Sequence, residues 1–139
     1  MGNDEAAALP HAYWHYLTAL GLPTPVMMLS KVNPHDAYLV GMEHSQEYSR
    51  LTLRLRCGDL QRGYSDVTLA FSQVAVDLAT LDTLLRAVRP ASVEVLYDEV
   101  DRSGESFVYR LLLYPDGEVS IQFQWVDIAE RPVADREAR

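Results

Sequence analysis

Residues 92–126, SVEVLYDEVDRSGESFVYRLLLYPDGEVSIQFQWV, are the stretch that decides the fold. Apolar and polar residues alternate along three segments of this stretch, and two loops that contain Gly, Asp and Ser or Pro separate the segments. Alternation with a period of two is typical of a strand that buries one face, and such loops are typical of hairpins. The stretch therefore predicts three consecutive antiparallel strands, and we expect the rest of the chain to pack on one face of them.

The second loop, Tyr114–Glu118, predicts how the second and third strands pair. Pro115 suits a turn position with φ of about −65°, and Gly117 suits a position with positive φ in a three-residue loop. Closing the loop in this way pairs Tyr114 with Glu118 and brings the large apolar side chains onto one face. The predicted pairs on that face are Leu113 with Val119, Leu111 with Ile121, Tyr109 with Phe123, and Phe107 with Trp125.

The first loop, residues 101–105, can be closed in the same way and predicts which carboxylate faces the core. Glu99 then points to the apolar face, opposite Phe107, and Asp98 points to the other face, near Arg110. A buried carboxylate has a raised pKa and can act as an acid or a base, whereas an ion pair with Arg110 is sufficient to explain Asp98. The candidate pocket on the apolar face consists of Tyr97, Glu99, Phe107, Tyr109, Phe123 and Trp125. The alternative is that these aromatic residues simply fill the core.

Two helices are predicted outside this stretch. Residues 9–20 have helical periodicity, with Pro10 suited to the first position and Gly21 to the position just past the end. Asp77 can cap a second helix that runs to about Arg89. The predicted core-facing stripe of this helix is Leu78, Leu81, Leu85 and Val88.

Alternating residues predict further strands at 50–57 and 65–73, and a weaker pattern predicts one at 37–44. Residues 26–32 are compatible with either a strand or a loop. The predicted fold class is α+β, with a largely antiparallel sheet of five or six strands and two helices in the order α-β(β)β-α-βββ. We expect residues 9–126 to form a single domain, and residues 1–8 and 127–139 to be flexible tails.

Composition limits the classes of partner. Of the 139 residues, 48% are hydrophobic and 23% are charged, which is typical of a globular protein. The net charge of −8 disfavours nucleic acid and membrane surfaces and suits a basic protein partner, although solubility alone explains it too. Cys57 is the only cysteine, and the first residues have no signal-peptide pattern, so we expect a cytoplasmic protein without an intrachain disulfide.

Sequence motifs of catalysis are not found. The chain has no G-x-S-x-G, Walker or G-x-G-x-x-G motif, so the sequence favours a non-enzymatic role and implies no cofactor. His11 and His15 are four residues apart on the first predicted helix, a spacing that can hold a metal ion. No third ligand has a fixed place beside them, so we expect two exposed histidines and no metal.

The outer side of the first predicted helix is the candidate interface, and it consists of His11, Trp14, His15 and Thr18. Tryptophan is enriched in protein interfaces, although another element could cover it within the fold. The sequence thus favours a protein-binding module of the chaperone, adaptor or immunity type that forms a homodimer. The alternative is a small-molecule-binding domain or an enzyme with an apolar pocket around Glu99.

Overall fold

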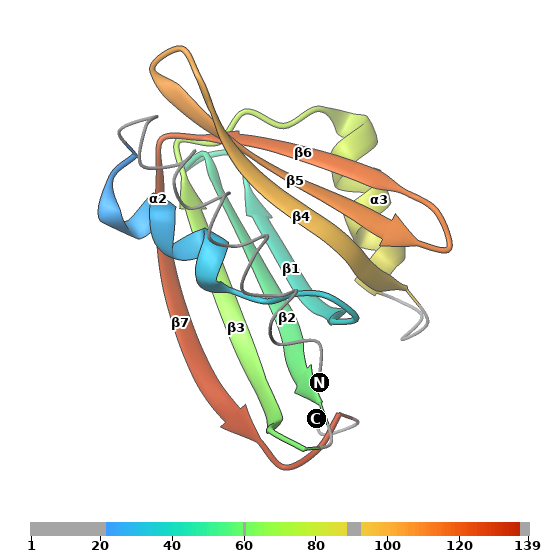
Figure 1. Cartoon of the computed structure of the whole chain (residues 1–139). Coiled ribbons are helices and arrows are strands. Elements are labelled where there is room, and N and C mark those ends of the chain that lie inside the picture. Colours follow the sequence, from blue (N-terminus) through green and yellow to red (C-terminus); the bar gives the residue numbers. More distant parts are fainter. Residues whose placement is uncertain (1–21, 60, 89–92, 137–139) are drawn as a thin grey trace.

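A computed structural model describes residues 22–59, 61–88 and 93–136 (Figure 1). The helix predicted at residues 9–20 lies outside this part of the chain. The described helices are α2 (Thr24–Met28), the 3-10 turn η1 (Leu29–Lys31) and α3 (Leu78–Val88). The strands are β1 (Tyr38–Ser45), β2 (Arg50–Asp59), β3 (Gly63–Ser72), β4 (Glu94–Ser103), β5 (Ser106–Tyr114), β6 (Glu118–Phe123) and β7 (Trp125–Val133). Of residues 26–32, for which the sequence suggested a strand or a loop, residues 26–31 are therefore helical.

The seven strands form one antiparallel sheet in the order β6-β5-β4-β1-β2-β3-β7. The α+β class is confirmed, and the sheet is larger than predicted. β4 joins β1 through one residue pair, Tyr38 with Glu94, so β4, β5 and β6 lie across the other strands (Figure 1). The chain passes at Gln124 from β6, at one end of the strand order, to β7 at the other. The sheet is consequently strongly curved.

β7 corrects the prediction of a tail at 127–139 for residues 127–133, which form a strand. This strand pairs with β3 from Ser72 opposite Trp125 to Tyr64 opposite Val133. Its inward residues are Val126, which is buried, and Ile128, which is half-buried, and most of the others are exposed. Two apolar positions give too little periodicity to indicate a strand, and Pro132 is tolerated because β7 lies at the edge of the sheet.

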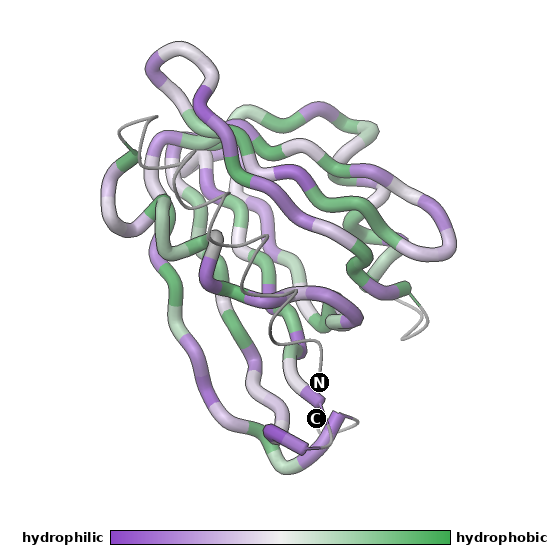
Figure 2. Tube along the Cα trace, viewed as in Figure 1, coloured by the Kyte–Doolittle hydropathy of each residue, from purple (hydrophilic) through white to green (hydrophobic). Residues whose placement is uncertain are grey.

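One hydrophobic core fills the inner face of the sheet, and apolar and polar residues alternate along the strands (Figure 2). Leu51, Leu53 and Leu55 of β2 are fully buried, as the pattern of this strand predicted. On α3, however, Leu78 is 84% exposed and Leu85 is 49% exposed, whereas Leu84 is fully buried. The predicted stripe of this helix was therefore wrong at Leu78 and Leu85, whereas Leu81 and Val88 pack against the core as predicted. The core-facing side of the helix also includes Leu84 and Ala87, because the helix packs against β1 and β6.

The predicted register of β5 and β6 was wrong by two residues. Leu111 lies opposite Val119 and Phe107 lies opposite Phe123, because the three-residue loop is closed one residue earlier on each strand than predicted: the Leu113 N–H donates to the Gly117 carbonyl at 2.8 Å. A shift of two residues leaves the side chains of β5 and β6 on their predicted faces, whereas Trp125, which was expected on the core face opposite Phe107, belongs to β7 and is 42% exposed. Gly117 has the expected positive φ, at 125°.

The predicted register of β4 and β5 was wrong by three residues from Tyr97 to Ser103 and by two residues at Glu94 and Val95. The loop contains only Gly104 and Glu105, and the register shifts again between Val95 and Tyr97, which is a β-bulge at Leu96. An odd shift turns the side chains of a strand to the opposite face. Asp98 and Glu99 have therefore exchanged the faces that the sequence predicted for them.

Candidate functional site

Four apolar side chains form an exposed surface on the outer face of β4 and β5, which we name the β4–β5 patch: Leu96, Tyr97, Leu112 and Tyr114. Their exposed fractions are 37%, 56%, 44% and 55%, in the same order. Tyr97 lies directly opposite Leu112, and Tyr114 lies opposite Glu94 one step further along the hairpin. Because successive side chains of a strand point to opposite faces and Leu111 and Leu113 are buried, Leu112 and Tyr114 must point outward. Neighbouring exposed apolar residues of this kind are typical of a binding surface.

Carboxylates border the β4–β5 patch. Glu99 forms an ion pair with Arg110 at 3.0 Å, and Glu94 forms one with Arg136 at 3.0 Å. Glu118 is exposed and lies opposite Leu112 on the neighbouring strand. The rim of the patch therefore carries two ion pairs, each of a glutamate with an arginine, and one further carboxylate, that of Glu118.

The structure does not bring the six residues of the predicted pocket onto one face. Phe107, Tyr109 and Phe123 are buried in the core, and the rings of Phe71 and Phe123 pack edge to face at 4.8 Å. Tyr97 and Trp125 are 56% and 42% exposed, and Glu99 lies on the outer face with Arg110. The residues of the predicted interface, His11, Trp14, His15 and Thr18, lie outside the described part of the chain.

Asp98 is the carboxylate that faces inward. Its Oδ2 accepts a hydrogen bond from the Tyr109 hydroxyl at 3.0 Å. Burial raises the pKa of Asp98 to about 6, and the hydrogen bond from Tyr109 partly opposes this shift. The sequence assigned this environment to Glu99, and the bulge at Leu96 gives it to Asp98 instead.

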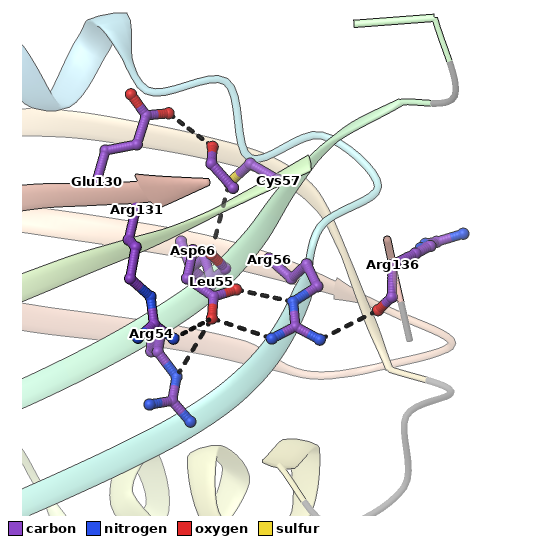
Figure 3. Close-up of polar contacts among 9 residues, drawn as sticks. Arg54, Leu55, Arg56, Cys57, Asp66, Glu130, Arg131 and Arg136 are labelled. Atoms are coloured by element: carbon purple, nitrogen blue, oxygen red, sulfur yellow. Dashed lines mark hydrogen bonds and ion pairs between the residues drawn. The ribbon is translucent and has the colours of Figure 1, made fainter. Parts of the chain in front are cut away.

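A buried ion pair lies on the opposite side of β2 and β3 from the core (Figure 3). Arg56 Nε donates to Asp66 Oδ1 at 2.8 Å, and Arg56 Nη2 donates to Asp66 Oδ2 at 3.0 Å. Both side chains are almost completely buried, with exposed fractions of 7% and 4%. The hydrogen bonds from Arg56 lower the pKa of Asp66. The alternation of residues 50–57 places Arg56 on the polar face of the strand, where an arginine is ordinarily exposed, so nothing in the sequence indicated this pair.

Arg136 covers the ion pair after the chain leaves β7. Its carbonyl accepts a hydrogen bond from Arg56 Nη1 at 3.2 Å, and its guanidinium lies 3.9 Å from the centre of the Tyr38 ring. The same guanidinium donates to the Asp36 carbonyl at 2.8 Å and to Glu94 at 3.0 Å. These contacts fasten the end of the described chain to β1 and β4, which gives the region a structural role.

A pocket of about 600 Å³ lies between the α2–η1 segment, the β2–β3 loop and β7. Its apolar lining residues are Met28, Val32, Cys57, Val67 and Ile128. Charged residues from several elements line it as well: Lys31, His35, Asp36, Asp59, Arg62 and Glu130. Burial raises the pKa of Cys57 to about 12, so its thiol stays protonated at neutral pH and is a poor nucleophile.

Two kinds of site were not found in the described ranges. No group of three or more His, Cys, Asp or Glu side chains among these residues is placed to hold a metal ion. None of the helices in the same part of the chain is long and apolar enough to span a bilayer.

The β4–β5 patch and the 600 Å³ pocket are thus the two surfaces from which function can be argued. Both are built by tertiary structure, since the patch depends on the Leu96 bulge and the pocket joins α2 to β7. Comparison of the chain with known protein families, with curated proteins and with solved structures found no match.

Proposed function

We propose that this chain is a non-catalytic protein-binding module of the chaperone, adaptor or immunity type, and that the β4–β5 patch is its docking surface. One observation carries the proposal: four neighbouring apolar side chains, two of them tyrosines, are exposed on one hairpin. Tyrosine combines a large apolar ring with a hydroxyl group that bonds to polar atoms, so it is enriched where proteins bind one another. A rigid sheet also holds these side chains in place before binding, which reduces the entropy lost on association.

The charge around the patch indicates the chemistry of the partner. Glu118 lies at the rim beside the two ion pairs of Glu94 with Arg136 and Glu99 with Arg110, and the whole chain has a net charge of −8. Opposite charge on a partner speeds association and rejects acidic competitors. The partner is therefore a protein segment that combines large apolar residues with Arg or Lys.

The test is a selection from a displayed library of random peptides, followed by fluorescence polarisation with the selected sequences. We expect the wild-type protein to select peptides that combine large apolar residues with Arg or Lys, with affinities that fall as salt is added. Replacing Leu112 with Asp should weaken binding by about tenfold or more, because it places a charge at the centre of the apolar contact.

Leu78→Asp is the matched control, since Leu78 is also exposed but belongs to α3. It makes the same change of size and charge away from the patch and should leave the affinity unchanged. Equal losses in both variants, or selection of acidic peptides, would contradict the proposed surface.

Small-molecule binding is a second candidate function, and the pocket of about 600 Å³ favours it. Pockets that hold small ligands are typically about 300–1,000 Å³ in volume, with a mostly apolar lining and a few polar groups. The apolar side chains of Val67 and Ile128, with Lys31 and Arg62 nearby, suit an amphipathic compound with an anionic group.

Titration with 1-anilinonaphthalene-8-sulfonate, followed by fluorescence, tests the pocket. Val67→Phe fills it and should weaken binding of this probe by about tenfold or more. Thr68→Phe is the matched control, because Thr68 is the next residue of β3 and points to the other face of the sheet. If Val67→Phe binds the probe as tightly as the wild-type protein does, the pocket is not the binding site.

A further inference from the structure

β7 has one edge that pairs with β3, and no other strand of the described residues pairs with its second edge. Trp125–Val133 therefore presents a row of backbone N–H and C=O groups along that edge. Such an edge accepts another strand, and natural proteins normally cover it or make it unsuitable for pairing. The question is whether the side chains of β7 favour one particular occupant.

Two of the three charged residues of β7, Asp127 and Arg131, are complementary to those of a second β7 strand that runs in the opposite direction, whereas Glu130 accepts a hydrogen bond from Ser65 of its own chain. In an antiparallel pair with a two-fold axis at Ala129, Asp127 of each copy lies opposite Arg131 of the other. All three residues are exposed and lie on the same face of the strand, because their numbers differ by two. Because of the two-fold axis, the pairing contains two contacts between Asp127 of one copy and Arg131 of the other.

Neighbouring registers lack this match. With the axis at Ile128, Asp127 lies opposite Ala129, and with the axis at Glu130, it lies opposite Val133. A shift by a single residue would join the inner face of one sheet to the outer face of the other. Ala129 is small enough to let two backbones meet at the axis, and Pro132, which has no N–H, ends the pairing at each side.

We infer that this protein forms a homodimer in which the outer edges of two β7 strands pair antiparallel about Ala129. The two seven-stranded sheets then become one continuous sheet with a two-fold axis. Because the same edge is used by both copies, the assembly closes at two chains and does not extend into a fibre. The inference is independent of the proposed function, since the β4–β5 patch lies on other strands.

Charge reversal tests the dimer by sedimentation velocity at about 100 µM protein, a concentration that detects even a weak dimer. We expect the wild-type chain to be a dimer. Asp127→Arg should raise the dissociation constant by about tenfold or more, because it places two arginines opposite each other at two places. Arg131→Asp should do the same with carboxylates. An equimolar mixture of the two variants should recover a heterodimer, since every contact then joins opposite charges.

The control for charge reversal is Glu105→Arg, at the exposed loop between β4 and β5, which should leave the dimer intact. Arg131 also lies 4.0 Å from Asp66, so thermal unfolding must show that each variant is folded. A monomeric wild-type chain, or a mixture of variants that remains monomeric, would overturn the inference.

A second test fixes the register without changing any charge. Residues directly opposite each other in an antiparallel pair have Cα atoms about 4.5–5.5 Å apart, which is within the range of a disulfide. Ala129→Cys should therefore give a disulfide-linked dimer under mild oxidation, and Glu105→Cys should not. The native Cys57 is buried with a raised pKa and should not interfere. Equal crosslinking of both variants would mean that the dimer, if present, does not use β7.

Discussion

Asp66→Asn is expected to lower the free energy of unfolding by about 3–5 kcal/mol at neutral pH, because it leaves the guanidinium of Arg56 buried without its anion. Asp66 accepts two hydrogen bonds from Arg56, at 2.8 and 3.0 Å, and both side chains are less than one tenth exposed. In such surroundings the attraction within the pair only offsets the cost of removing both charges from water. Removing one partner keeps that cost for the other, so the loss exceeds the net contribution of the intact pair.

The size of this effect is measured by urea unfolding of the folded variants. Glu99→Gln is the matched control, because Glu99 also pairs with an arginine but both side chains are more than one third exposed. It should cost less than about 1 kcal/mol. The double replacement Arg56→Met with Asp66→Leu should recover most of the stability lost in Asp66→Asn, since it removes both charges. Equal losses for Asp66→Asn and Glu99→Gln would show that the Arg56–Asp66 pair is solvated.

The effect of Asp66→Asn should also depend on pH. The pKa of Asp66 is lowered in the folded state, mainly by its hydrogen bonds with Arg56. A lowered pKa means that the carboxylate stabilises the fold above its unfolded pKa and that this contribution is lost as the pH falls through the folded pKa. The difference between the variant and the wild-type protein should therefore shrink in acid.

Asp98→Asn is expected to stabilise the protein, and the gain should develop as the pH rises from 3.8 to about 6 and be complete above that range. Burial raises this pKa from 3.8 to about 6, so the folded protein binds the proton more tightly than the unfolded chain does. Stability from this group is fully present below pH 3.8, and it is lost as the pH rises to about 6. A shift of this size corresponds to about 3 kcal/mol at pH 8. Asparagine has no charge to bury and can still accept the hydrogen bond from Tyr109.

Urea unfolding at pH 4 and at pH 8 measures this gain. Asp98→Asn should match the wild-type protein at pH 4 to within about 1 kcal/mol and exceed it at pH 8 by about 2–3 kcal/mol. Asp82→Asn on the exposed side of α3, where the pair with Arg86 is more than 60% exposed, should change stability by less than about 0.5 kcal/mol at either pH. A gain in Asp98→Asn that is the same at both values of pH would show that the carboxylate is not desolvated.

For the hairpin of β5 and β6, the sequence predicted correctly which side chains of the two strands are buried, but not which residues of the two strands pair. Tyr109, Leu111, Ile121 and Phe123 are buried as the alternation indicated, even though the loop at Gly117 shifts the pairing by two residues. The wrong position of the loop was harmless there because an even shift preserves the faces of both strands. In the preceding hairpin the pairing of Tyr97–Ser103 with β5 is shifted by three residues, and this odd shift exchanged the faces of Asp98 and Glu99, whereas the bulge at Leu96 leaves Val95 on its predicted face.

The candidate surfaces could not be predicted because they depend on contacts between distant parts of the chain. Tyr97 joins the β4–β5 patch only because of the bulge, and Leu112 was expected to be an ordinary residue of an outer face. The 600 Å³ pocket requires α2 beside β7, two segments separated by about the whole described chain. The edge of β7 is part of a segment with too few apolar residues to indicate a strand.

By itself, the amino-acid sequence determined the α+β class, the strands with strict alternation and the residues of the central core, because burial of one face requires a fixed period of apolar side chains. Only the tertiary structure decided whether each register shift is odd or even and which apolar residues of α3 face the core. It also decided that Trp125–Val133 form a strand and that Arg56 and Asp66 are buried together. The physical reason is the same in each case. Each of these features depends on a residue that is distant in the sequence: a bulge is fixed by the neighbouring strand, β7 by its pairing with β3, and the burial of Arg56 by Arg136. The local pattern of apolar and polar residues does not contain this information.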